Sequence, residues 1–136
     1  MNPPQDFVIY QFGLAWSEAA TVLTRVLNQG RTLVPEDRHR LMAALNSCQA
    51  ARKELSDGTA VGTTIRRVTQ PLYKKDSLND LLMEAEECLQ LLSQSVTPVE
   101  TVVLSRAKLA WLVEFLSDLC ILLLREIATK SLTVSA

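Results

Sequence analysis

Residues 97–128 constrain the fold of this chain more than any other stretch. The segment has one proline, at its second position, and no glycine, and its apolar residues recur at spacings of three and four. On a helical wheel these residues leave a narrow polar arc, which holds Glu114, Asp118 and Arg125. A helix that is apolar around most of its circumference needs neighbouring helices or a partner chain to cover it. The stretch therefore predicts one long helix at the centre of a small helical bundle.

The predicted central helix carries its own start signal. Thr97 is followed three residues later by Glu100, which is the pattern of a capping box. Pro98 falls at the first helical position, where its missing N–H removes no hydrogen bond within the helix. Together these residues predict a helix over about 98–129.

A membrane span is the main structural alternative for the same stretch. Its uninterrupted apolar part, residues 109–124, is 16 residues long and contains Glu114 and Asp118. A spanning helix needs about 20 mostly apolar residues, and an acidic side chain at mid-bilayer costs about 3 kcal/mol. We therefore expect no membrane among the partners of this chain.

The same periodicity predicts three further main helices, over about 6–29, 35–56 and 77–93. The first is followed by Gly30, a residue favoured just past the end of a helix. Apart from one long link, the connections are short, which is typical of an antiparallel up-down-up-down bundle. We therefore expect an all-α fold with four main helices in a single domain over residues 1–136.

The one long link, residues 57–76, leaves more than one structure open. It is rich in threonine and valine and is interrupted by Gly62 and Pro71. A connection of this length is uncommon in a compact domain. We favour a short fifth helix within 59–70 or a partly ordered loop, and a small hairpin is the third alternative.

The charge of the chain is divided along its length, although the net charge is only −1. Residues 1–24 carry −2, residues 25–75 carry +6, and residues 76–136 carry −5. Such asymmetry indicates an anionic partner for the basic segment. The alternative is that the basic segment neutralises the acidic one within the bundle or within an oligomer.

The basic segment supplies the candidate nucleic-acid site. Bases at helical spacing can follow a phosphate backbone, and an aromatic ring among bases can stack on a single strand. Tyr73 is the aromatic residue in such a position. The predicted contacts to RNA or single-stranded DNA are Arg38, Arg52, Lys53, Arg66, Arg67, Tyr73, Lys74 and Lys75.

The sequence contains no pattern that indicates catalysis, a cofactor, a metal site or a small-molecule substrate, so we expect a protein that is not an enzyme. The single histidine, His39, lies between two arginines and has no local partners for a catalytic triad or a metal site. Cys48, Cys88 and Cys120 are far apart and each falls on the apolar stripe of a different predicted helix. We therefore expect reduced core cysteines in an intracellular, cytoplasmic protein.

Two functions follow from these patterns. In size, helical character and divided charge, the chain resembles the small helical subunits of CRISPR effector complexes, which implies a non-catalytic subunit that contacts a nucleic-acid backbone in a larger nucleoprotein assembly. The alternative is a protein-only adaptor or homodimer with an apolar interface on the long C-terminal helix. The predicted interface residues are Leu112, Phe115, Leu119 and Leu122.

Overall fold

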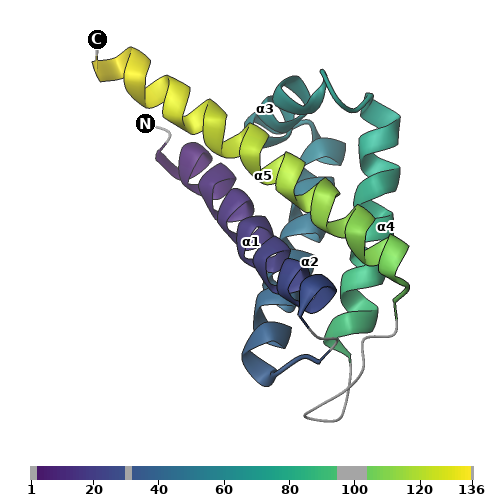
Figure 1. Cartoon of the computed structure of the whole chain (residues 1–136). Helices are drawn as coiled ribbons and strands as arrows, with labels where there is room; N and C mark the ends of the chain where they lie inside the picture. Colours follow the sequence, from purple (N-terminus) through teal and green to yellow (C-terminus); the bar gives the residue numbers. More distant parts are fainter. Residues whose placement is uncertain (1–2, 30–31, 95–103, 136) are drawn as a thin grey trace.

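The computed structural model describes residues 3–29, 32–94 and 104–135 of the chain, and these residues form a helical bundle (Figure 1). The helices of the described part are α1 (Pro3–Asn28), α2 (Pro35–Asp57), α3 (Ala60–Thr69), α4 (Lys75–Ser93) and α5 (Arg106–Ser135). The all-α class is confirmed. The short fifth helix is confirmed as well, because α3 lies within the predicted range 59–70.

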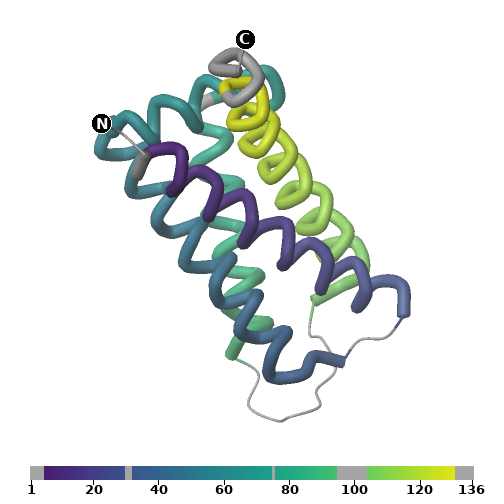
Figure 2. Tube along the Cα trace, turned by 90° about the vertical axis from the view of Figure 1, so that its left-hand side faces the viewer, coloured from purple at the N-terminus to yellow at the C-terminus, as the bar shows by residue number. Residues whose placement is uncertain are grey.

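The four long helices alternate in direction along the chain, so the up-down-up-down arrangement is confirmed (Figures 1 and 2). The first and last helices, α1 and α5, pack side by side over the largest contact in the molecule. Helices α2 and α4 form a second antiparallel pair, and α1 packs along α2 to join the two pairs. The short α3 lies at the end of the bundle where α2 ends and α4 begins.

The start of the long C-terminal helix differs from the prediction. Helix α5 begins at Arg106, and the two residues before it are not helical, so no unbroken helix runs from residue 98. Ser105 caps the observed start: its Oγ accepts a hydrogen bond from the N–H of Lys108 at 3.1 Å, which satisfies a free N–H of the first turn. The predicted capping box at Thr97 lies outside the described residues.

Three other helix ends also differ from the predicted ranges by two residues or more. Helix α1 begins at Pro3, three residues before the predicted start. Helix α4 begins at Lys75, two residues before the predicted start. Helix α5 continues to Ser135, six residues past the predicted end. Within the described residues, no helix combines the length and the apolarity that crossing a membrane requires.

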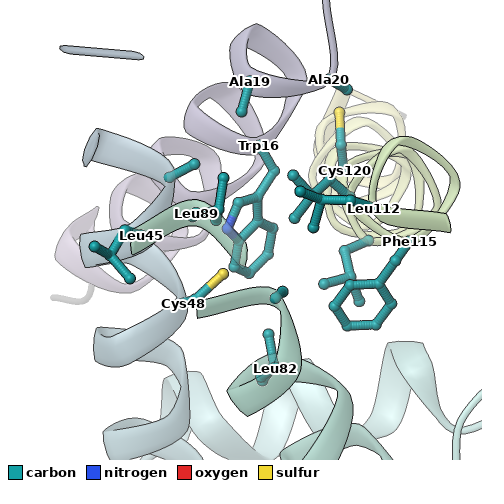
Figure 3. Close-up of a cluster of buried hydrophobic side chains, with 14 of the residues drawn as sticks. Trp16, Ala19, Ala20, Leu45, Cys48, Leu82, Leu89, Leu112, Phe115 and Cys120 are labelled. Atoms are coloured by element: carbon teal, nitrogen blue, oxygen red, sulfur yellow. The ribbon is translucent and has the colours of Figure 1, made fainter. Parts of the chain in front are cut away.

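The core is centred on Trp16 of α1, whose indole lies among side chains from α2, α4 and α5 (Figure 3). Trp16 is 1% exposed and stacks on Phe12, with 5.7 Å between ring centroids. Its neighbours in Figure 3 include Leu45, Cys48, Leu82, Leu89, Leu112 and Phe115. Four helices therefore depend on one large side chain for their common packing.

The three cysteines are buried and unpaired, as expected for core residues. Burial raises the pKa of Cys48 to about 12, and the neighbouring Trp16 side chain offsets part of that rise. Burial also raises the pKa of Cys88. A thiol with a raised pKa is a poor nucleophile, so these positions fit packing and not chemistry.

The predicted partner surface on α5 requires a correction. Leu112, Phe115 and Leu119 are buried within the chain, at 0%, 2% and 1% exposure, because its own helices cover that side of α5. Leu122 is half-buried. The first three residues therefore belong to the core and are not available to a partner.

Candidate functional site

Two of the predicted nucleic-acid contacts are held by acids of the same chain. Nη1 of Arg52 donates to both carboxylate oxygens of Glu86 on α4, each at 2.8 Å. Arg67 forms an ion pair with Glu126 on α5. Both arginines therefore join helices, as the alternative interpretation of the divided charge expects, and a phosphate would have to compete with these carboxylates.

The predicted basic residues do not form one surface. Arg38 and Lys53 lie on the same helix, about 22 Å apart along its axis at a rise of about 1.5 Å per residue. Arg38 is half-buried and Lys53 is exposed. The side chain of Lys75 lies outside the described residues. The set therefore divides between the two ends of α2.

Tyr73 is anchored against α5 and does not stand free for stacking on a base. Its hydroxyl donates to Oδ2 of Asp118 at 3.2 Å, and its ring meets Phe115 edge-on, with centroids 5.5 Å apart. Burial, followed by the Asp118 carboxylate, raises the pKa of Tyr73 to about 12. The residue thus ties the α3–α4 turn to α5.

Replacing Tyr73 with phenylalanine should change how stability depends on pH. Because the pKa rises from 10.0 to about 12 on folding, the folded state holds the phenol proton more tightly, and this contribution is complete below pH 10 and lost as the pH approaches 12. Urea titrations across that window should show a steeper loss of unfolding free energy in the wild type than in Tyr73→Phe. Equal slopes would contradict a pKa of Tyr73 that folding raises.

Three of the predicted residues do converge, on a cleft at the end of the bundle. The cleft has a volume of about 590 Å³ and lies between the end of α2, the short α3 with its following turn, and the start of α4. Arg66, Tyr73 and Lys74 come from the predicted set. The remaining lining residues are Leu55, Ser56, Thr69, Gln70, Asp76, Leu78, Asn79 and Asp80. The cleft therefore combines a buried apolar floor with charged walls of both signs.

Arg66 is the best-fixed cation of the cleft. Its Nη2 donates to the backbone carbonyl of Leu55 at 3.1 Å, which holds the guanidinium against the end of α2. Its Nε is buried and makes no hydrogen bond within the described residues. An arginine has five N–H donors, so Arg66 retains donors for a ligand. No group of three histidine, cysteine or acidic residues suited to a metal ion occurs in the part of the chain that the structure describes.

A second candidate surface lies on α1, and the sequence predictions missed it. Phe7 is 61% exposed, and Tyr10 and Leu14 follow it at spacings of three and four, which places all three on one side of the helix. Ile121 on α5 is 51% exposed. We name these four residues the α1/α5 face. Contiguous exposed apolar side chains are a feature of protein interaction sites.

The α1/α5 face continues into a groove of about 450 Å³ between the same two helices. Small side chains line much of this groove, which leaves room for a side chain of a partner to enter. The lining residues are Ser17, Ala20, Thr21, Thr24, Arg25, Asn28, Gln29, Ser117, Cys120 and Ile121. Apolar residues beside a groove of small residues are suited to receive a helix.

A signal for this face was present in the sequence. The core stripe of α1 includes Phe12, Trp16 and Leu23, all buried. Phe7, Tyr10 and Leu14 form a second apolar stripe on the same helix. The sequence prediction considered only one apolar stripe per helix, the one facing the core, and so missed this second stripe. An amphipathic helix with two apolar stripes indicates two contacts, one within the chain and one outside it.

No family model, no curated protein and no solved structure matches this chain. The cleft and the α1/α5 face are the two features of the described residues that bear on function.

Proposed function

We propose that this protein is a non-catalytic helical interaction module that pairs with a second copy of itself through the α1/α5 face. The observation that supports this most directly is the exposed stripe of Phe7, Tyr10 and Leu14 on α1, together with the exposed Ile121 on the neighbouring helix α5. If a second copy covered these four side chains, the dimer would be stabilised by about 25 cal/mol for each Å² of apolar surface removed from water. The two helices involved pack over the largest contact in the chain, so the face has a rigid base.

The register between α1 and α5 is set at both ends of the pair. At one end, Nζ of Lys130 lies 3.3 Å from Oδ1 of Asp6. At the other end, Nη1 of Arg106 donates to the backbone carbonyl of Leu27 at 2.8 Å. These contacts fix which residues of the two antiparallel helices lie at the same level.

Exposed charges of both signs lie beside the α1/α5 face. From the Asp6 end, α1 presents Glu18 and then Arg25, while α5 presents Arg125 and then Glu114. A two-fold axis parallel to the helices would place α1 of one copy against α5 of the other, with the opposite charges of Arg25 and Glu114 about 6 Å apart along the helix axes. Glu18 and Arg125 would lie about 12 Å apart along the axes, too far to pair directly. Arg25 keeps 42% of its side-chain surface exposed while pairing with Asp37. One charge pair, Arg25 with Glu114, therefore favours a second copy as the partner.

The nucleic-acid subunit function stays a prediction of the sequence, and the geometry favours it less. Arg52 and Arg67 are engaged by acids, and Arg38 lies far from the cleft that holds Arg66 and Lys74. Backbone recognition requires several bases along one track, and each phosphate contact adds to the salt dependence of binding. Binding of RNA or single-stranded DNA at low salt that weakens steeply as the salt concentration rises would support that hypothesis.

Charging the centre of the α1/α5 face should dissociate the dimer. Ile121→Glu buries a carboxylate in the interface, and a central hot-spot substitution of this kind costs about 2 kcal/mol or more, or roughly 30-fold in Kd. Sedimentation velocity over a range of concentrations should show a dimer for the wild type and a monomer for Ile121→Glu. Circular dichroism should show both to be equally helical.

Leu91→Glu is the matched control for this experiment. Leu91 is 53% exposed on α4, close to the 51% of Ile121, but lies outside the α1/α5 face. This variant should keep the dimer. A wild-type chain that stays monomeric at all concentrations, or a dimer that both variants weaken alike, would contradict the proposal.

A further inference from the structure

The cleft at the α2–α4 end contains charges of both signs that do not neutralise one another. Arg66 and Lys74 contribute two positive charges, and Asp76 and Asp80 contribute two negative charges. Among the described residues, none of these four forms an ion pair with another. Elsewhere in the bundle, Arg52, Arg67 and Lys108 all pair with an acid on another helix.

Three of the side chains that line the cleft, Arg66, Tyr73 and Asn79, are held in place without a ligand. Arg66 is fixed by the Leu55 carbonyl at 3.1 Å, and Tyr73 by Asp118 at 3.2 Å. Asn79 accepts a hydrogen bond from Nε of Arg52 at 3.4 Å, and Arg52 is itself fixed by Glu86. A site whose groups are already ordered loses less entropy when a ligand binds.

The cleft also has an apolar floor. Leu55 and Leu78 are buried at its base, with 8% and 1% exposure, and Thr69 between them is fully buried. Its volume of about 590 Å³ is within the usual range of small-ligand sites, about 300–1,000 Å³. The space therefore fits a small ligand that has one apolar side chain.

We propose that this cleft binds a short peptide with a free amino and a free carboxyl terminus. The carboxylate would bind Arg66 and Lys74, the ammonium group would bind Asp76 and Asp80, and the apolar side chain would cover Leu55 and Leu78. Because the lining charges sum to zero, an ion of either sign alone meets two like charges. A ligand that carries both charges meets a partner for each of them.

The dipeptide glycyl-leucine and its blocked forms test this proposal. Titrated into the ¹⁵N-labelled full chain, glycyl-leucine should give saturable amide shifts in α3, the following turn and the start of α4. N-acetyl-glycyl-leucine lacks the ammonium group and glycyl-leucine amide lacks the carboxylate. Each should bind at least roughly tenfold more weakly, since a hydrogen bond to a charged group contributes about 1.5–3 kcal/mol.

Two variants connect the chemical groups of the ligand to the residues. Arg66→Gln should weaken binding of glycyl-leucine and of the N-acetyl form, but should change binding of the amide little. Asp80→Asn should weaken binding of glycyl-leucine and of the amide, but should leave the N-acetyl form little changed. Arg125→Gln, on the exposed side of α5, should bind all three ligands like the wild type, and amide spectra check that every variant is folded.

Three results would overturn the proposal. They are the absence of saturable shifts with glycyl-leucine, equal affinity for the free and N-acetylated dipeptides, and shifts confined to residues outside the cleft. None of these results depends on whether the chain forms a dimer, because Arg66 and Asp80 lie outside the α1/α5 face.

Discussion

Replacing Gly62 with alanine should destabilise this protein by about 3 kcal/mol or more, because the added methyl group has no space. A Cβ at Gly62 would lie 2.5 Å from the carbonyl carbon of Glu54 and 3.0 Å from the backbone nitrogen of Leu55. Backbone atoms at the end of α2 cannot rotate away as a side chain can. Helix α3 would therefore have to separate from α2, and the cleft between them would lose its shape.

Two further variants show whether the effect of Gly62→Ala is specific. Thr63→Ala changes the exposed next residue of α3 and should cost less than about 0.5 kcal/mol. Gly58→Ala places a side chain in open space at a φ of 65°, so it should cost about 1–2 kcal/mol from backbone strain alone. Urea titrations followed by circular dichroism should give this order. A Gly62→Ala protein as stable as Thr63→Ala would contradict the close contact between α3 and α2.

Truncating Trp16 to alanine should have an effect of similar size. The side chain is 1% exposed at the meeting point of α1, α2, α4 and α5, and removing a large aromatic side chain from a core costs about 3–5 kcal/mol (Figure 3). We expect the midpoint of thermal unfolding, followed by circular dichroism, to fall accordingly. At a wild-type stability of about 5 kcal/mol, the low end for small domains, this loss would leave about 0–2 kcal/mol, so a measurable fraction of the chain would be unfolded at 25 °C.

Trp111 offers a control of the same residue type. It is half-buried on α5, where it stacks on Phe115 with ring centroids 5.4 Å apart. Trp111→Ala should therefore cost clearly less than Trp16→Ala. Trp16→Phe should cost less than Trp16→Ala, because it keeps an aromatic ring in the core. Equal losses for the two alanine variants would show that Trp16 is not the centre of the core.

Helix periodicity was sufficient to predict the class and order of the bundle, but it could not fix where α5 begins. Local rules favour Thr97, which is followed by Pro98 and Glu100, over Ser105, which has Lys108 three residues later. The observed helix begins at Arg106 after Ser105. The choice depends on packing against helices distant in sequence, which a local pattern does not contain.

The candidate interface on α5 was also mispredicted because a local sequence pattern does not show which distant helices pack against it. Leu112 and Leu119 were predicted at an interface because α5 carries more apolar surface than one neighbour can cover. The structure shows that the other helices of the chain bury both. A helical wheel gives the directions of side chains but not the number of neighbours around them.

The basic segment illustrates the limit for charge. Arg52 and Glu86 are 34 residues apart in sequence, and Arg67 and Glu126 are 59 apart, yet each pair is in contact. Composition predicted a segment of +6 but not the pairing that neutralises part of it. Three of the predicted residues, Arg66, Tyr73 and Lys74, do line one cleft. Their grouping was predictable because they are close together in the sequence.

The proposed arrangement of the dimer can be measured directly by crosslinking two different variants. Thr21 on α1 and Glu114 on α5 are exposed at nearly the same level of the helix pair. Thr21→Cys protein mixed with Glu114→Cys protein should form a disulfide between the two kinds of chain under mild oxidation, while the buried native cysteines stay unreactive. A mixed dimer identified by mass spectrometry is the result we predict. Absence of the mixed disulfide, or disulfides only between identical variants, would contradict pairing of α1 with α5 across the two copies.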